Sequence, residues 1–440
     1  MTKRLLLLFI VSTVVAQQVS AQQDLSKAEA IRVVMENNFD VIISKNNITI
    51  AENNTSIYNS GYLPTLTGSA AINYNKDNLV VEFQDGAERT LDGATSNNRN
   101  AGLSLNYVLF DGFNRKYSMD RNRENLNLSQ LSARATLETV LASLFSAYYS
   151  VARNQLTITS LKETLDISKD RLVRTKFGFE YGRNTRLDVS NAEVDVNTDS
   201  INYLNAKQTL GDAQRNLNLI LGRKRLEPLK VDTTLFFMTS ILDETAFRAA
   251  VTTQNTNVLV AQSGLTISQL DIKVNSSRYM PTLSLSGGYN ARLGNNNSAS
   301  FTASNSSSGL TGGLSLGWNI FDGGSTKTTI QNAKINQANQ KILLEQTMQQ
   351  VVILFENAWS DYQNKLFIIS AQENNLKSNE LNFERTEEQY KLGQVTSLDF
   401  RTSQSNLLLA RTNLIDAKYE AKIAEILIFQ LAGKIQEANF

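Results

Sequence analysis

The sequence of 440 residues contains no cysteine, no histidine and only 3 prolines. The lack of cysteine excludes disulfides, thiolate nucleophiles, iron–sulfur clusters and cysteine-based zinc sites. The lack of histidine removes the commonest general base and the commonest ligand of transition metals. Average usage would give about 22 prolines in a chain of this length. The deficit predicts a chain that is either very helical or very repetitive.

The chain also has little net charge, since it contains 43 basic and 42 acidic residues. The chain has no cluster of Lys and Arg that would indicate a nucleic-acid partner or a surface for anionic lipid headgroups. Gly323–Lys327 lacks the spacing of a phosphate-binding loop, and Asp195–Asp199 lacks the glycine that a calcium loop needs at its sixth position. No grouping of nucleophile, base and orienting residue supports a secreted enzyme. We therefore expect no catalytic site, no cofactor and no metal.

Residues 1–21 have the pattern of a secretory signal peptide. Lys3 and Arg4 precede an apolar stretch at Leu5–Val15, and Val19–Ala21 has the small residues of a cleavage site. The apolar stretch is too short for a membrane-spanning anchor, which needs about 20 residues. Because no apolar run of 18 residues follows, we expect membrane contact through β-strands or surface helices.

The mature chain is a tandem duplication. Three collinear pairs of segments match at offsets of 217, 211 and 211 residues: Tyr62–Leu66 with Tyr279–Leu283, Leu105–Gly112 with Leu316–Gly323, and Arg174–Asp188 with Arg385–Asp399. The offset changes within polar segments around 76–100 and 293–308, which we predict to be loops because loops tolerate insertions best. We predict a first repeat over 22–225, a linker over 226–242 and a second repeat over 243–440.

Each repeat is predicted to contain a helix, a pair of strands and a long helical hairpin. The helices lie at 24–59 and 243–276, the strand pairs at about 65–110 and 282–321, and the hairpins at 113–222 and 325–434. The strands alternate apolar and small polar residues, which fits one face in hydrocarbon and one in water. The first helices of the hairpins contain no proline over about 63 residues, or roughly 95 Å. Helices this long need partners of similar length, which the returning tracts 187–221 and 398–432 supply.

The two hairpin tips share one sequence pattern. Gly182 and Gly393 stand where a helix commonly ends in the left-handed conformation. A few residues later, Thr185 with Asp188 and Thr396 with Asp399 form the spacing of an N-terminal capping box. Helix capping is therefore the structural explanation for Asp188 and Asp399, beside any functional one.

These features together resemble the TolC-like family of bacterial outer-membrane efflux proteins, and the resemblance covers essentially the whole mature chain. It implies a mixed α and β membrane protein, a homotrimer whose four strands per protomer form one 12-stranded outer-membrane β-barrel. A long α-helical barrel continues it into the periplasm. The strand pattern agrees, since four strands cannot close alone and an open edge in a membrane leaves backbone groups unsatisfied.

The resemblance implies a passive exit duct of a tripartite efflux or type I secretion system in the cell outer membrane. Its partners would be a periplasmic membrane-fusion adaptor, an inner-membrane pump of the RND or ABC type and outer-membrane lipid. A periplasmic helical-hairpin adaptor or filament-forming protein is the alternative. The exported substrate is not readable from a chain whose polar strand faces are rich in Ser, Thr, Asn and Gly.

The family's gate lies at the periplasmic tip, where a ring of aspartates narrows the pore. Asp399 matches the first acidic position of that ring, whereas Thr402 stands at the second. Tyr390 matches the gating tyrosine, but Val395 stands at the position of the gating arginine, so Asp188 lacks its usual partner. Three arginines near the tips are candidate replacements, with a plain solvated surface role as the alternative: Arg183, Arg186 and Arg401.

Two further groups of residues follow from the resemblance. The tip that the adaptor grips would comprise Gly182, Gly393, Phe179, Tyr181 and Leu392. The aromatic residues at the membrane interface would be Tyr74, Tyr107, Tyr289 and Trp318. Packing within a sheet core is the alternative for these aromatic side chains.

Overall fold

The computed structural model describes residues 25–223, 228–233 and 242–437. The predicted signal peptide and most of the predicted linker lie outside these residues. The chain forms two compact units. One comprises Met1–Asn46, Leu131–Val260 and Glu345–Phe440, and the other comprises Asn47–Gln130 and Ala261–Leu344. Each unit therefore takes segments from both sequence repeats, and is described separately below.

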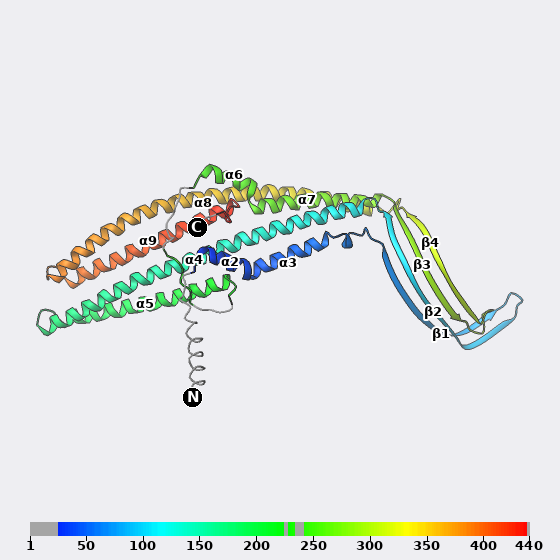
Figure 1. Ribbon diagram of the computed structural model, residues 1–440, viewed down its shortest axis with the longest axis horizontal. Coiled ribbons are helices and arrows are strands. Elements are labelled where there is room, and N and C mark those ends of the chain that lie inside the picture. The colour runs from blue at the N-terminus through cyan, green and yellow to red at the C-terminus, as the bar shows by residue number, and fades with distance from the viewer. Residues whose placement is uncertain (1–24, 224–227, 234–241, 438–440) are drawn as a thin grey trace, which may run out of the picture. The chain divides into compact units, whose positions relative to one another are not determined.

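The second unit contains an antiparallel four-stranded sheet in the order β1-β2-β3-β4 (Figure 1). Its strands are β1 (Thr65–Glu82), β2 (Glu88–Phe110), β3 (Thr282–Asn295) and β4 (Ser304–Gly317). The first strand of each repeat thus pairs with the second, and β2 pairs with β3 across the repeats. Within the described residues, β1 and β4 each have only one neighbouring strand, so the sheet has two open edges.

The strand pairs were predicted correctly, but their lengths were not. β1 and β2 continue through most of 76–100, where we had predicted a loop, and only 83–87 separate them. The first paired residues there are polar or small, as in Lys76 opposite Thr95, and apolar pairing returns only near the turn, with Leu79 opposite Leu91. Backbone pairing holds the polar part together without apolar alternation, so the sequence there indicates a loop. β4 ends at Gly317 instead of continuing to 321.

One face of the sheet carries large apolar side chains that nothing in the described chain covers. Leu310, Leu314 and Leu316 of β4 are 85%, 67% and 70% exposed, and Leu66 and Ile72 of β1 are 69% and 75% exposed. An apolar surface of this kind marks contact with a membrane or another protein.

The two repeats each contain one proline at an equivalent position, between a helix and the first strand of the repeat. Pro64 and Pro281 directly precede β1 and β3. Each follows a short 3₁₀ turn, η2 (Ile57–Asn59) or η3 (Ser277–Tyr279), at the end of helix α3 (Phe39–Asn54) or α7 (Thr256–Ser276). Proline has no backbone N–H and so interrupts helices and central strands. It is tolerated at these joints because they lie between a helix and a strand.

The long helical hairpins agree closely with prediction. In the first repeat α4 (Asn114–Glu180) returns as α5 (Arg186–Ile220), and in the second α8 (Ser325–Lys391) returns as α9 (Ser397–Leu431) (Figure 1). Both first helices have 67 residues, or about 100 Å. Within the described residues, no helix has the length and apolar character needed to cross a membrane.

The core of the first unit shows the duplication again. The predicted single helices before the sheet are each broken, into α2 (Lys27–Asn37) and α3, and into α6 (Glu244–Gln254) and α7. Asn38 and Asn255 stand at the two breaks, and their amides donate to Ile220 O and Leu431 O at 2.8 Å in each case. These bonds attach each break to the end of the returning helix. The surrounding core is apolar and includes Leu144, Val151, Leu217 and Ile426.

Candidate functional site at the hairpin tips

Both hairpin tips turn through a glycine in the left-handed conformation, as predicted. Gly182 has φ +69° and Gly393 has φ +74°. The turn then closes by backbone bonds typical of a helix end, from Arg183 N to Gly178 O at 2.7 Å and from Gln394 N to Gln389 O at 2.9 Å. The two tips are therefore built alike, and a Cβ added at either glycine would meet no atom within 4 Å.

Each returning helix begins with the predicted capping box. Asp188 Oδ2 accepts from Thr185 N at 2.8 Å, and Thr185 Oγ1 accepts from Asp188 N at 3.2 Å. The corresponding distances for Asp399 and Thr396 are 3.0 Å and 3.2 Å. Capping is thus a role of both aspartates, although it leaves the Asp399 side chain exposed.

The capping bonds keep both carboxyl groups ionised. The backbone N–H and then the hydroxyl of Thr185 lower the pKa of Asp188. The hydroxyl and then the backbone N–H of Thr396 lower the pKa of Asp399. Each group is therefore negatively charged at neutral pH.

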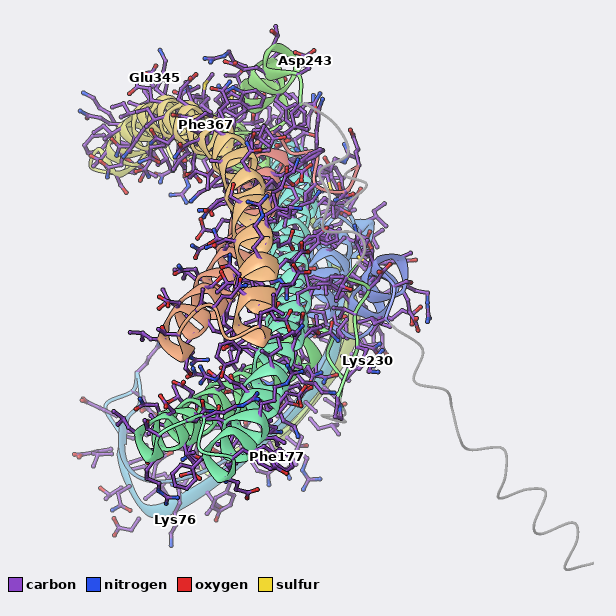
Figure 2. The ribbon with its side chains drawn as sticks, turned by 90° about the vertical axis from the view of Figure 1, so that its left-hand side faces the viewer. Lys76, Phe177, Lys230, Asp243, Glu345 and Phe367 are labelled. Carbon is purple, nitrogen blue, oxygen red and sulfur yellow. The ribbon has the colours of Figure 1, made fainter. Side chains whose placement is uncertain are left out.

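A groove of about 1010 Å³ lies between the two tips of the chain. Six predicted residues line it: Tyr181, Arg183, Asp188, Tyr390, Leu392 and Gly393. The other predicted tip residues are not among its lining: Phe179, Gly182, Arg186, Asp399 and Arg401. Phe177, close to the end of α4 (Figure 2), and Arg174 also line the groove, and neither is among the predicted site residues.

The groove combines exposed apolar side chains with positive charge. Tyr181 and Leu392 are 80% and 72% exposed, and Phe177 is 57% exposed. Within the described chain, the side chains of Arg174 and Arg183 take part in no ion pair. Aromatic residues and arginines are the types that dominate binding energy in protein interfaces.

Tyr390 packs inside the second tip. Its ring stacks on that of Phe400 with centroids 4.8 Å apart and an interplanar angle of 29°. Phe400 is buried and also contacts Phe383, at 5.6 Å between centroids. The tyrosine therefore forms part of the apolar cluster that joins the end of α8 to the start of α9.

Arg401 lies in a buried polar network and is bound to partners other than Asp188. Its two Nη atoms donate to the two carboxylate oxygens of Asp199, each at 2.7 Å, and its Nε is 3.5 Å from Asp195. Burial opposes the charge of Arg401, but the hydrogen bonds and attraction of the two aspartates prevail and raise its pKa. Of the three candidate partners of Asp188, this one is already occupied.

The network continues into α4. Arg171 pairs with Asp195, and Ser168 Oγ donates to Asp199 Oδ2 at 2.6 Å. Gln404 Nε2 of α9 donates to Thr164 O at 2.9 Å. The network thus joins α4 and α5 of the first repeat to α9 of the second. Its two arginines and two aspartates balance one another in charge.

Sequence reasoning missed this network. Asp195 and Asp199 were considered only as a calcium-loop pattern, and Arg171 and Gln404 were not considered. A usable signal was present, because the two aspartates are one helical turn apart and hence share a face of α5. Identifying their partners requires knowing which helices pack together.

The predicted interface aromatics lie in the sheet unit. Tyr74, Tyr289 and Trp318 are 65%, 49% and 60% exposed, whereas Tyr107 is half-buried. Trp318 Nε1 donates to Tyr279 O at 3.1 Å, which attaches the end of the sheet to the turn before β3. The exposure of the first three argues against packing in a sheet core.

Known proteins resemble the chain over most of its length. The family model described as "Outer membrane efflux protein" matches residues 30–223 and 250–434. The outer membrane efflux protein BepC of Brucella suis is 21% identical, covering 91% of this chain and 83% of its own. The outer membrane protein TolC of Vibrio cholerae is 23% identical, covering 86% and 84% respectively.

A solved structure has the same fold. The Campylobacter jejuni CmeC outer membrane channel superposes with a TM-score of 0.76 at 16% identity, covering 93% of this chain and 85% of that one. The likeness confirms the expected duplicated architecture of a four-stranded sheet joined to long helical hairpins. By the match of the family model to both repeats, the chain belongs to the outer membrane efflux protein family.

Proposed function

We propose that this protein is a passive exit duct of a tripartite efflux or type I secretion system, gated at the hairpin tips. The observation that carries the proposal is a four-stranded sheet with an uncovered apolar face and two open edges, joined to long helical hairpins. An apolar face of this kind suits contact with the outer-membrane lipid, and the helices suit a periplasmic tunnel. The named relatives are efflux and outer-membrane proteins. We propose no enzymatic activity for the chain.

The open edges support assembly of several copies. In a membrane every backbone N–H and C=O needs a partner, so β1 and β4 must pair with strands of other copies. A homotrimer, as in the family resemblance, supplies 12 strands in one closed barrel. Each copy then contributes one pair of hairpins to the tunnel.

The two hairpin tips, with the groove between them, are proposed as the docking surface of a periplasmic adaptor. The exposed side chains of Phe179, Tyr181 and Leu392 offer apolar anchors, and the glycine turns at Gly182 and Gly393 let a partner approach the backbone closely. The adaptor would connect the duct to an inner-membrane pump, of the RND or ABC type, that supplies the energy.

The gate is proposed to use the charged tips. Three copies of Asp399 would form an acidic ring that attracts cations. Tyr390 would hold the start of α9 in place through its stack on Phe400. Asp188 would meet Arg183 or Arg186 of a neighbouring copy, since Val395 offers it no charge.

Purification in detergent followed by mass measurement and planar-bilayer recording tests the proposal. We expect particles of three chains and discrete cation-selective conductances that a tip-binding adaptor increases. A water-soluble monomer without conductance would overturn the proposal and favour a helical-hairpin adaptor or filament subunit instead.

A further inference from the structure

The two places where a strand passes into a long helix are built alike but carry different cations. Each has the sequence Phe-Asp-Gly, which begins with the last residue of β2 at 110–112 and follows β4 at 321–323. In each, the aspartate accepts from the backbone N–H four residues later, Asp111 from Arg115 at 2.9 Å and Asp322 from Thr326 at 2.8 Å. Because the two corners share this backbone, differences between them point to function.

In the first repeat the corner arginine has a hydrogen-bond partner at each of its three nitrogen atoms. Arg115 Nε pairs with Asp111 at 3.1 Å, and its Nη atoms donate to Gly61 O and Leu109 O, both at 3.2 Å. Its guanidinium also lies over the ring of Tyr62, 5.0 Å from the centroid. This side chain is only 15% exposed, and each of its three nitrogen atoms already donates a hydrogen bond.

In the second repeat the arginine is at the other of two equivalent positions. Thr326 takes the place of Arg115, and Arg278 takes the place of Gly61. The Thr326 hydroxyl donates to Asp322 at 2.5 Å, so the cap is complete without an arginine. Among the described residues, the Arg278 side chain makes no hydrogen bond and no ion pair. It is an exposed guanidinium that the corner does not need.

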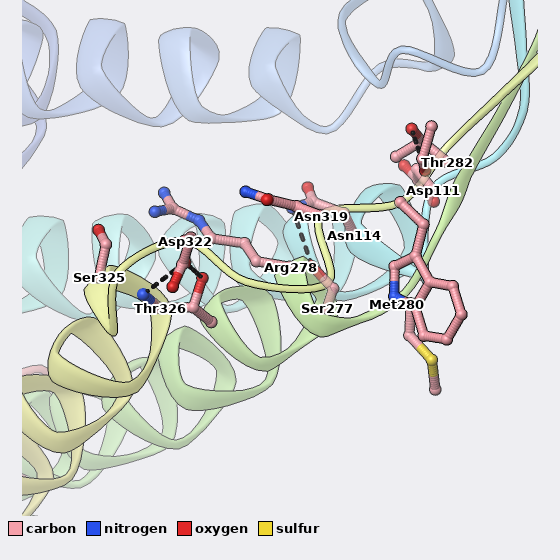
Figure 3. A pocket seen from close by; sticks show the side chains of 12 residues that line it. Asp111, Asn114, Ser277, Arg278, Met280, Thr282, Asn319, Asp322, Ser325 and Thr326 are labelled. Carbon is pink, nitrogen blue, oxygen red and sulfur yellow. Dashed lines mark hydrogen bonds between the residues drawn. The ribbon is translucent and has the colours of Figure 1, made fainter.

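Arg278 lines a pocket of about 900 Å³ at this corner. Figure 3 shows its side chain extending toward the side where Asp322 and Ser325 lie, with Met280 at the other side, next to the strands. The polar lining includes the Asn114 amide, which donates to Ser277 Oγ at 3.0 Å. The pocket therefore has the Arg278 charge on the side near the helices and the exposed apolar side chain of Met280 near the sheet, where Asp111 is paired with Arg115.

Asp322 keeps room for one more donor. Its Oδ1 accepts from Gly324 N at 3.1 Å, and its Oδ2 accepts both bonds from Thr326. A carboxylate has about four acceptor sites, so one remains. The bonds from Thr326 lower the pKa of Asp322, which stays ionised at neutral pH. In the described part of the chain, the pocket thus presents one free cation, Arg278, and the carboxylate of Asp322 with spare capacity, while the second lining carboxylate, Asp111, is paired with Arg115.

The apolar side of the pocket is suited to lipid. Met280 and Trp318 are 50% and 60% exposed, and Trp318 continues the apolar face of β4 carried by Leu314 and Leu316. Tryptophan is enriched where a membrane meets water, with its ring at the level of the headgroups. In an outer membrane efflux protein, the point where strands give way to helices lies at that level.

We propose that this pocket binds the headgroup of a phospholipid with a primary amine, such as phosphatidylethanolamine. Arg278 would bind the phosphate, Asp322 would accept from the ammonium, and Met280 and Trp318 would pack against the glycerol and the first acyl carbons. The opposite charges of a zwitterionic headgroup match the opposite charges of the pocket. The proposal rests on the outer-membrane placement in the proposed function.

The test uses the full-length protein purified in detergent, with lipid binding read by native mass spectrometry. We expect phosphatidylethanolamine to bind more tightly than phosphatidylcholine, whose amine donates no hydrogen bond, or phosphatidylglycerol, which has no amine. Arg278→Gln should weaken this binding about tenfold, the loss of one charge-assisted contact. Arg278→Lys should restore part of it, and inorganic phosphate should not compete.

Matched variants separate the outcomes. Asp322→Asn keeps a capping acceptor and should abolish the preference over phosphatidylglycerol, and Arg292→Gln on β3 should change nothing. Equal lipid binding by wild type and Arg278→Gln overturns the proposal. Dissociation of the oligomer in Arg278→Gln also overturns it, in favour of a carboxylate from a neighbouring copy. Conductance of the same samples tests the proposed function separately, since a duct can conduct without this lipid.

Discussion

Arg401 and Asp199 form a two-pronged ion pair in which each Nη of the arginine donates to one carboxylate oxygen at 2.7 Å. Arg401 belongs to α9 and Asp199 to α5, so the pair joins the hairpin of the second repeat to that of the first. Asp199 is 2% exposed, and water therefore competes little for its charge. The pair is both bidentate and buried, the geometry in which charge-assisted hydrogen bonds are strong.

Removing one partner of this pair should be costly. Asp199→Asn leaves the Arg401 charge beside a neutral amide, and we expect a loss of about 3–5 kcal/mol in unfolding free energy. Arg401→Gln should cost a similar amount, and the double variant should cost less than the sum. Thermal and denaturant unfolding in detergent measures all three, with a coupling of about 0.5–3 kcal/mol expected.

A second cross-hairpin pair provides the control. Arg411 of α9 and Glu163 of α4 are 2.6 Å apart, with the Glu163 side chain 53% exposed. Glu163→Gln should cost at most about 1 kcal/mol, because exposed pairs contribute little. Equal losses for Glu163→Gln and Asp199→Asn would show that burial does not determine the strength of these links.

The sequence predicted the elements of this fold better than its contacts. The repeat offset located both hairpins, and the glycine and Thr-x-x-Asp patterns located their tips, because both are local signals. The Arg401–Asp199 pair depends on contact between residues about 200 positions apart, and a buried charge has the same sequence pattern as an exposed one. The extension of β1 and β2 was missed for a related reason, since its polar part, such as Lys76 opposite Thr95, is held by backbone bonds that need no apolar alternation.

The charge of Asp399 should influence ion selectivity of the duct. Asp399→Asn removes the charge while keeping an acceptor for the Thr396 cap, so we expect lower cation selectivity with little change in stability. Reversal potentials in planar bilayers under a salt gradient measure this. Asp188→Asn, the equivalent change at the first tip, is the matched control. Unchanged selectivity in Asp399→Asn would limit this residue to capping.

The same group predicts how selectivity depends on pH. Hydrogen bonds from Thr396 lower the pKa of Asp399, so its charge is present above the ordinary aspartate range of about 4 and is lost only below it. Cation selectivity should be constant between pH 7 and 5 and should fall at lower pH. In Asp399→Asn this acid-dependent fall should be smaller. A decline already complete at pH 5 would point to another titrating group.

Lys27 should make stability rise with pH in mildly alkaline solution. The side chain is buried, its Nζ donates to Tyr149 Oη at 3.2 Å, and burial followed by repulsion from Lys422 lowers its pKa to about 8. Glu425 and Asp232 oppose this shift but do not cancel it. Between pH 8 and the ordinary lysine pKa of about 10.4, the unfolded chain binds more protons than the folded one, so stability increases with pH.

A neutral replacement tests this. Lys27→Met removes the titrating group, and its melting temperature should change less between pH 7 and 9.5 than that of the wild type. Lys45→Met, at an exposed lysine of α3, should keep the wild-type pH dependence. If the melting temperatures of Lys27→Met and wild type depend on pH in the same way, another titrating group and not Lys27 causes the change in stability.

Two glycines with the same backbone conformation should differ in their tolerance of a side chain. Gly222 has φ +66° and Gly182 has φ +69°, so alanine at either position costs about 1–2 kcal/mol of backbone strain. At 222 a Cβ would also collide with the Asn37 carbonyl, whereas at 182 it meets open space. Gly222→Ala should therefore lower the melting temperature clearly more than Gly182→Ala. Hydrogen exchange at the Arg223 and Arg183 amides, which close the two turns, should show local opening only at the first site, and equal effects at both would mean that the Asn37 backbone moves away without cost.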